Sequence, residues 1–360
     1  MILQNSIRNF SPIWGASLMG TGMLSVILGM VSQENGTAHI FALIFLVINI
    51  LVFLVISIFW FARWILYFPD IKKDLMNPMI VTFFPTYPIG VIILAKVFLL
   101  SYGFIISTET SILIAKILWI VGSLLVVVLN FIIIAIMFIH KSINLDHATN
   151  GWLIPEIGLL MVSAIGCDLV PLFPEFIGHL LFYFCFFAFG AGFFIYLFFN
   201  TILINRYVYR ELPPVAATPT IWIGLGPIGA SIFAINKLAN VITKIKVLYL
   251  VFNDVRVLAE VFQFISIALY GLGLFWLILA IILTLYQLYI NKMRLPYVMG
   301  WWSFTFPIGS FCAATIFLNR IFNFVLFDIL AIFMFILLIF FWSITSVNTV
   351  SSILKSKPIS

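Results

Sequence analysis

Ten apolar runs dominate this sequence, and each is long enough to cross a lipid bilayer. A helix needs about 20 apolar residues to cross the ~30 Å hydrocarbon core. Runs of that length cover 10–31, 39–65, 80–100, 111–139, 151–170, 176–204, 218–235, 257–289, 297–318 and 321–350. Hydrophobic residues make up 64% of the chain and charged residues only 8%, and the connections between runs are too short to fold alone. The sequence therefore predicts an all-α integral membrane protein with a single transmembrane domain over 1–360.

The odd-numbered runs each carry a proline or glycine interruption, whereas the even-numbered runs are longer and largely unbroken. From Gly20 through Pro88, Pro155, Pro227 and Pro307, the interruptions follow at steps of 68, 67, 72 and 80 residues. Three of them read Pro-Ile-Gly, so the general frequency of Pro and Gly in membrane helices is the weaker explanation. A period of one broken helix plus one whole helix indicates five copies of a helical hairpin. The predicted hairpins cover approximately 10–66, 80–140, 151–205, 218–290 and 297–350.

Five hairpins predict a quasi-fivefold arrangement around a central pore within one polypeptide. Broken helices suit the inside, where exposed backbone carbonyls can meet water, and whole helices suit the lipid. The predicted helix breaks consist of Gly20, Gly22, Pro88, Gly90, Pro155, Gly158, Pro227, Gly229, Pro307 and Gly309.

The residues just before the breaks predict a constriction of the pore. They are Met19, Tyr87, Ile154, Gly226 and Phe306. A hydrophobic constriction can gate by excluding water and by steric block, and Phe306 is the largest apolar side chain of this set. The alternative is that Phe306 packs between helices like other phenylalanines of the chain.

Charged residues inside the apolar runs are the candidates for contact with a transported species. Lys96, Lys237 and Arg320 follow their prolines by eight, ten and thirteen residues, which predicts a basic ring at the pore mouth that attracts anions. The alternative is that each side chain snorkels to the interface. Glu156 directly follows Pro155 at membrane depth, where a carboxylate is a functional-site hypothesis by default. Glu156 is a candidate for proton coupling. The alternative role is structural: its side chain would form a hydrogen bond with a backbone group that the helix break leaves without a partner.

Other functions find little support in the sequence. The net charge of +6 comes from residues in short loops and at helix ends rather than in a stripe, so no nucleic-acid partner is expected. No metal site, cofactor or enzyme motif is found. Eleven of the 18 Lys and Arg residues lie on one side, which predicts cytoplasmic N and C termini. In that topology, Asp168 is assigned to a loop on the opposite side.

Two motifs carry a resemblance to a known family. The run FSPIWGASLMGTG at 10–22 and the run WWSFTFPIG at 301–309 resemble the first and ninth helices of the tellurite-resistance/dicarboxylate transporter family. That family includes the malate permease, the sulfite efflux pump and the guard-cell slow anion channels. The resemblance implies a homotrimer with one pore in each protomer. It also implies a pore-blocking phenylalanine in the ninth helix, assigned to Phe306, with Phe304 as the second choice.

These observations together predict an anion transporter of the plasma membrane. The resemblance favours a C4-dicarboxylate (malate-type) transporter that works without a cofactor. The alternative is a channel or exporter for small inorganic anions such as sulfite, chloride, nitrate or a tellurite-related anion. A dicarboxylate needs two separated cationic contacts, whereas a small anion needs only a positive field, and the sequence leaves this choice open.

Overall fold

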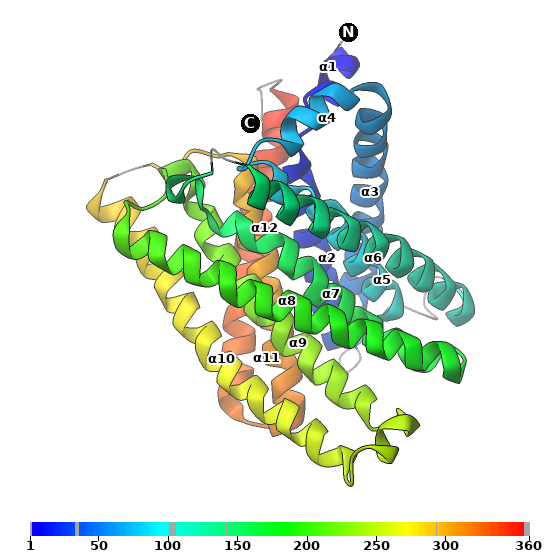
Figure 1. Cartoon of the computed structure of the whole chain (residues 1–360). Coiled ribbons are helices and arrows are strands. Elements are labelled where there is room, and N and C mark those ends of the chain that lie inside the picture. Colours follow the sequence, from blue (N-terminus) through cyan, green and yellow to red (C-terminus); the bar gives the residue numbers. More distant parts are fainter. Residues whose placement is uncertain (1, 33–35, 101–105, 141–142, 293, 356–360) are drawn as a thin grey trace.

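Helices account for all regular structure in the part of the chain that is described. The computed structural model describes residues 2–32, 36–100, 106–140, 143–292 and 294–355, and no strand occurs in these ranges (Figure 1). Ten helical spans among them are long and apolar enough to cross a membrane. This confirms the predicted all-α membrane architecture with ten spans.

The ten helices divide into five buried ones and five exposed ones. The buried, inner helices are α2 (Gly15–Ser32), α5 (Thr86–Leu100), α7 (Ile154–Leu169), α9 (Leu225–Ile242) and α11 (Thr305–Phe322). The outer helices are α3 (Gly36–Leu66), α6 (Thr108–Ile139), α8 (Glu175–Tyr209), α10 (Val255–Leu285) and α12 (Val325–Leu354). The percentages refer to an 18-residue apolar window in each span. In the inner helices 83 to 100% of the window is buried, against 22 to 39% in the outer helices. The broken spans therefore lie inside and the whole spans outside, as predicted.

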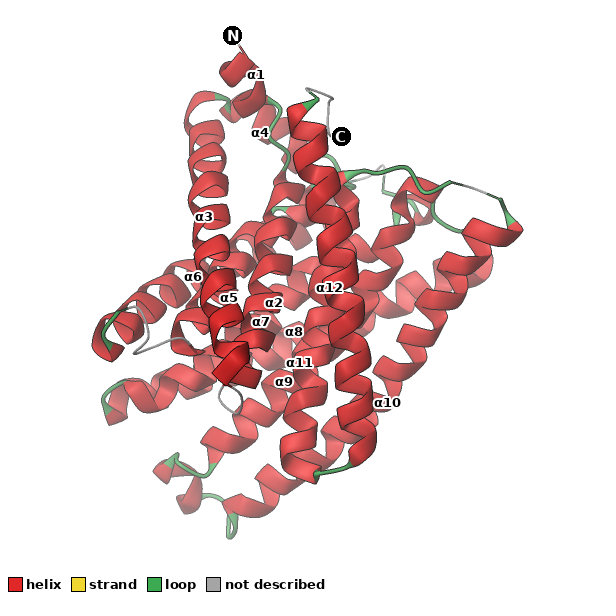
Figure 2. Ribbon diagram, turned by 180° about the vertical axis from the view of Figure 1, so that it is seen from behind, coloured by secondary structure: helices red, strands yellow, loops and turns green. Residues whose placement is uncertain are grey.

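The inner helices form a closed ring. Going around it, α2 contacts α5, α5 contacts α7, α7 contacts α9, α9 contacts α11, and α11 returns to α2. Each outer helix packs on the inner helix that precedes it in the chain (Figure 2). Because one outer span lies between successive inner helices, the chain crosses back each time, and all five inner helices run in the same direction and bring their C-terminal ends to one side. That the hairpins are copies of one repeat stays a prediction.

The four proline interruptions are helix starts rather than kinks within a long helix, whereas Gly20 and Gly22 lie inside α2 (Gly15–Ser32). A short 3₁₀ segment precedes each inner helix, at Pro12–Trp14, Val81–Phe83, Asn150–Leu153, Val215–Gly224 and Met299–Phe304. Pro88, Pro227 and Pro307 are the third residues of their α-helices, and Pro155 is the second. The first four N–H groups of a helix lack an intrahelical acceptor, so proline in the first turn sacrifices no hydrogen bond.

The largest boundary error concerns the seventh span. Its predicted end was 235, just before Asn236 and Lys237, but α9 continues to Ile242. Asn236 donates its side-chain amide to the carbonyl of Ile232 one turn earlier, and Lys237 is paired with a buried carboxylate. Both polar side chains thereby find partners inside the protein, so they do not end the helix.

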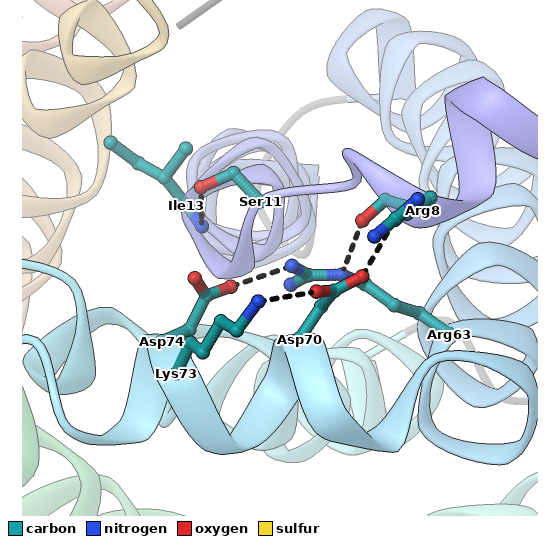
Figure 3. A network of polar contacts seen from close by, with 7 residues as sticks. All are labelled: Arg8, Ser11, Ile13, Arg63, Asp70, Lys73 and Asp74. Carbon is teal, nitrogen blue, oxygen red and sulfur yellow. Dashed lines mark hydrogen bonds and ion pairs between the residues drawn. The ribbon is translucent and has the colours of Figure 1, made fainter.

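An ion-pair network ties the N-terminal helices together at the end of the molecule that also holds the C-terminal end of α12 (Figures 1 and 2). Two short helices contribute to it, α1 (Ile2–Arg8) and α4 (Phe68–Leu75). Arg8 pairs with Asp70 at 2.7 Å, and Arg63 at the end of α3 pairs with Asp74 at 2.7 Å. Arg63 also donates to the backbone carbonyl of Arg8 at 2.9 Å (Figure 3). The network joins α1, α3 and α4 and leaves the ring of inner helices untouched.

Candidate functional site: a central cavity with a lysine pair

A small cavity lies at the centre of the ring, with residues of all five inner helices in its wall. Its lining includes Met23 of α2, Ile93 and Lys96 of α5, Met161 of α7, Phe233 of α9 and Ala313 of α11. The volume is about 10 Å³, which is room for about one water molecule. At this point the centre of the ring of inner helices is filled by side chains, except for a space the size of one water molecule.

Two lysines from different inner helices share one carboxylate, with Lys96 buried and Lys237 partly buried. Lys96 of α5 lies 2.7 Å from one oxygen of Asp168, and Lys237 of α9 lies 2.6 Å from the other. The side chains of Lys96, Lys237 and Asp168 are 9, 15 and 17% exposed, so solvent screens the pairs only weakly. Two ammonium groups and one carboxylate leave a net charge of +1. Because Lys96 also lines the cavity, this charge lies at the cavity wall.

The lysine pair lies near the C-terminal ends of its helices, and aromatic contacts help to hold it. Lys96 and Lys237 lie in the last two turns of α5 and α9 but not in the last turn, so the partial negative charge of the helix ends, which acts within the last turn, reaches them only weakly. Lys237 also lies over the rings of Phe233 and Phe317, 5.3 and 5.2 Å from their centroids. These contacts hold the ammonium group against α9 and α11.

Arg320 does not join the lysine pair. It donates to the backbone carbonyl of Met30 at 2.8 Å and lines a separate groove of about 690 Å³ between α2, α3, α11 and α12. Of the three basic residues predicted for the pore mouth, Lys96 and Lys237 share Asp168, whereas Arg320 ties α11 to α2; the basic ring itself stays a prediction. The guanidinium group of Arg320 donates to a carbonyl near the C-terminal end of α2 and lines the groove between α2, α3, α11 and α12.

Asp168 is the site residue that sequence reasoning missed. Its assignment to a loop is wrong, because it occupies the last turn of α7 (Ile154–Leu169). One signal pointed to it: Asp168 follows Pro155 by thirteen residues, the same offset that separates Arg320 from Pro307.

Phe306 lies at the N-terminal end of α11, on the opposite side of the cavity from the lysine pair. The ring is buried, with 3% exposure, and it packs against Gly226 of α9. A methyl group added at Gly226 would lie 3.4 Å from Cε1 of Phe306 and 3.0 Å from Cδ1 of Ile157 on α7. Phe306, Ile157 and the bare backbone of Gly226 therefore form one closed layer between three inner helices.

Two other aromatic candidates point away from the ring axis. Phe304 stacks on Phe341 of outer helix α12 with centroids 4.3 Å apart, and Trp222 meets it edge-on. Tyr87 stacks on Trp60 of outer helix α3 at 4.6 Å. Its hydroxyl group makes a hydrogen bond of 2.8 Å with Ser57 of the same helix. Placing Tyr87 in the constriction is therefore a wrong prediction, since its polar tip finds its partner on α3.

The glycines at the predicted breaks allow neighbouring helices to pack closely. They were expected instead to expose backbone carbonyls to water in a pore. A methyl group at Gly229 would lie 2.7 Å from the backbone nitrogen of Phe311, and one at Gly309 would lie 2.7 Å from Cβ of Met23. Added methyl groups would meet a neighbouring helix equally closely at Gly20, Gly22, Gly90 and Gly158. Small residues of this kind let membrane helices pack at short distance. Of these six, Gly229 also lines the cavity. Met19 and Ile154 are buried in the hydrophobic core.

Glu156 is fully buried in the first turn of α7. Neither of its carboxylate oxygens accepts a hydrogen bond from another residue of the described chain. The nearby carbonyl of Pro155 is bound by Asn130 of α6 at 2.7 Å, so the structural hydrogen bond expected for Glu156 is made by a different residue. Glu156 is not part of the cavity lining.

Comparisons with known proteins agree with this architecture. Residues 9–350 match the family model of the voltage-dependent anion channels, SLAC1. Two uncharacterized transporters of Methanocaldococcus jannaschii are each 33% identical to the chain; one alignment covers 98% of the chain and 97% of the relative, the other 96% and 94%. A sulfite efflux pump of Arthroderma otae is 26% identical, with 96% of the chain and 91% of the relative covered. With a match over nearly its whole length, the chain belongs to the voltage-dependent anion channel family, as the motifs at 10–22 and 301–309 predicted.

Proposed function

We propose that the protein moves small anions across a membrane through the centre of its ring of inner helices. The observation that carries this proposal is the convergence of Lys96 and Lys237 beside a cavity lined by all five inner helices. Charges at this depth are costly and mark ion pathways, and basic side chains lining a pore favour anions. Membership in the anion channel family supports the same function.

The geometry favours a small oxyanion over the C4-dicarboxylate that the sequence suggested. A dicarboxylate needs two separated cationic contacts, but Lys96 and Lys237 meet at the two oxygens of one carboxylate. This spacing matches a single compact oxyanion. The similarity to sulfite efflux pumps supports sulfite as the first candidate, with nitrate and chloride as smaller alternatives.

A malate-type dicarboxylate is the second candidate, and Arg320 is the observation that favours it. Arg320 lies near the C-terminal end of α11, on the same side of the ring as the lysine pair, and would supply a separate cationic contact if it left the groove that it lines. A homotrimer, a plasma-membrane location and cytoplasmic termini are further proposals, supported by the family resemblance and by the distribution of Lys and Arg.

The closed layer of Phe306 and Ile157 supports a gating role for Phe306. An anion that passes along the ring axis meets this layer on one side of the cavity and the lysine pair on the other. In this proposal, transport requires the Phe306 ring to move aside.

A flux assay in liposomes tests the proposal. Purified protein is reconstituted, and uptake of malate, sulfite, chloride and nitrate is compared with and without a proton gradient. We expect sulfite to exceed malate, and we expect Lys96→Gln and Lys237→Gln each to lower flux by roughly tenfold. Lys246→Gln serves as the control, because Lys246 forms an exposed ion pair with Glu175 away from the cavity. Flux equal to that of empty liposomes for all four anions, in wild type and in Phe306→Ala alike, would contradict anion transport.

A further inference from the structure

Asp168 carries a negative charge at a position where its own helix, α7, disfavours one. It lies in the last turn of α7, and a carboxylate at a helix C-terminus is repelled by the partial negative charge there. What stabilises it is external to α7: one ammonium group from α5 and one from α9, at 2.7 and 2.6 Å. The carboxylate is therefore positioned by the lysine pair and not by the helix that carries it.

The carboxylate of Asp168 also has the chemistry of the proposed cargo. Its two oxygens each accept one charge-assisted hydrogen bond, so it bridges the two lysines as an oxyanion would. With Asp168 in place, one N–H of each ammonium group is engaged, and one of the two positive charges is balanced. A transported anion that reaches the cavity wall meets a site that another anion fills.

We propose that Asp168 is a built-in competitor that occupies the anion site of the lysine pair and that the transported anion must displace. This inference rests on the proposed function, and it assigns Asp168 the role of a specificity-determining residue at the same site. Its side chain is 17% exposed and lies two residues before the 3₁₀ turn Val170–Leu172, so it has solvent to turn toward when it leaves the lysines. Displacement limits occupancy to anions that bridge both ammonium groups at least as well as a carboxylate does.

The inference predicts that removing the competing charge tightens anion binding. In Asp168→Asn the amide is neutral, and a lost charge-assisted hydrogen bond of ordinary strength corresponds to about a tenfold change in affinity. Dissociation constants for sulfite, nitrate, chloride and malate are measured by calorimetry on the full chain in detergent. We expect values about tenfold lower in Asp168→Asn than in wild type for the anions that bind. Asp168→Glu retains the carboxylate and should stay close to wild type.

A purely structural role for Asp168 gives a different result. If the carboxylate only neutralises the two lysines, its removal leaves them unpaired and lowers the melting temperature without tightening anion binding. Equal or weaker binding in Asp168→Asn would therefore overturn the inference. Adding Lys96→Gln to Asp168→Asn should cancel the gain in affinity, and a gain that persists would place the anion elsewhere and also overturn it.

The same measurements separate this inference from the proposed function. Should none of the four anions bind or cross in wild type, Phe306→Ala or Asp168→Asn, the proposed function fails and the inference with it. Where wild type binds and transports an anion but Asp168→Asn leaves its dissociation constant unchanged, the inference alone fails. If Asp168→Asn is poorly folded by size exclusion, Asp168→Ser replaces it, and the same comparison of dissociation constants decides.

Discussion

The ring of Phe306 rests on the bare backbone of Gly226, across the boundary between α11 and α9. A methyl group at position 226 would lie in ordinary van der Waals contact with the Phe306 ring, at 3.4 Å, and would crowd Ile157 of α7 at 3.0 Å. Because Ile157 of α7 approaches the same point, residues of three of the five inner helices meet there. In the proposed transport function, this contact between α7, α9 and α11 is the layer that closes the path.

Replacing Phe306 with Ala should raise anion flux in liposomes by about an order of magnitude or more, because it removes the ring from the closed layer. Phe304→Ala is the matched control: Phe304 packs on Phe341 of an outer helix, so its loss should leave flux unchanged. Large-to-small changes in a core also cost stability, typically about 3–5 kcal/mol. Folding is therefore checked by size exclusion before flux is compared. Unchanged flux in Phe306→Ala, or a rise in Phe304→Ala alone, would remove Phe306 as the gate.

Gly226→Ala tests the partner of that contact. The added methyl group would lie 3.0 Å from Ile157, which must give way by a few tenths of an ångström, and in ordinary contact with Phe306 at 3.4 Å. We expect basal flux to rise, but by less than in Phe306→Ala, and we expect no further rise when both changes are combined, since residues in contact are not additive. Gly271→Ala on α10 is the control, because an added methyl group there meets no atom within 4 Å. Fully additive effects of the two changes on flux would show that Gly226 and Phe306 act independently.

Much of the fold was predictable from the sequence because the bilayer imposes it. Ten apolar runs of sufficient length permit little else than ten spanning helices, and four prolines together with Gly20 marked the five spans that lie inside. The pairing of charges was not predictable in the same way. Lys96, Asp168 and Lys237 come from three helices, and their contact depends on how those helices rotate within the ring. The outward turn of Tyr87 toward Ser57 depends likewise on a partner 30 residues away that no local pattern reveals.

Glu156→Gln tests the candidate for proton coupling. An ionised carboxylate without a partner is costly at this depth, and Glu156 accepts no hydrogen bond from another described residue. If proton transfer at Glu156 accompanies transport, the glutamine variant should lose the pH dependence of uptake while anion exchange at equal pH continues. The measurement is initial uptake of sulfite and nitrate at a series of external pH values. Nitrate stays charged throughout this range, so it separates an effect on the protein from protonation of the cargo. Retained pH dependence of nitrate uptake would return Glu156 to a structural role.

The N-terminal network should make a small, pH-dependent contribution to stability. The hydrogen bond from Arg8 holds the pKa of the Asp70 carboxyl below its ordinary value of 3.8. A group whose pKa is lowered by folding stabilises the protein above its unfolded-state pKa, and this stabilisation is lost as the pH falls through the folded-state value. Asp70→Asn should therefore lower the melting temperature by no more than a few degrees near pH 7, because exposed ion pairs contribute little.

That difference between wild type and Asp70→Asn should shrink once the pH falls below about 4, where the wild-type carboxyl begins to take up its proton. The measurement is a pair of melting curves in detergent at each pH, at low ionic strength so that screening is limited. Asp254→Asn is a suitable control: Asp254 caps the N-terminus of α10 by accepting from the backbone N–H of Arg256 and has no contact with the Arg8 network. A melting-temperature difference that stays constant from pH 7 to pH 3 would show that Asp70 stabilises this end of the molecule by packing and not by its charge.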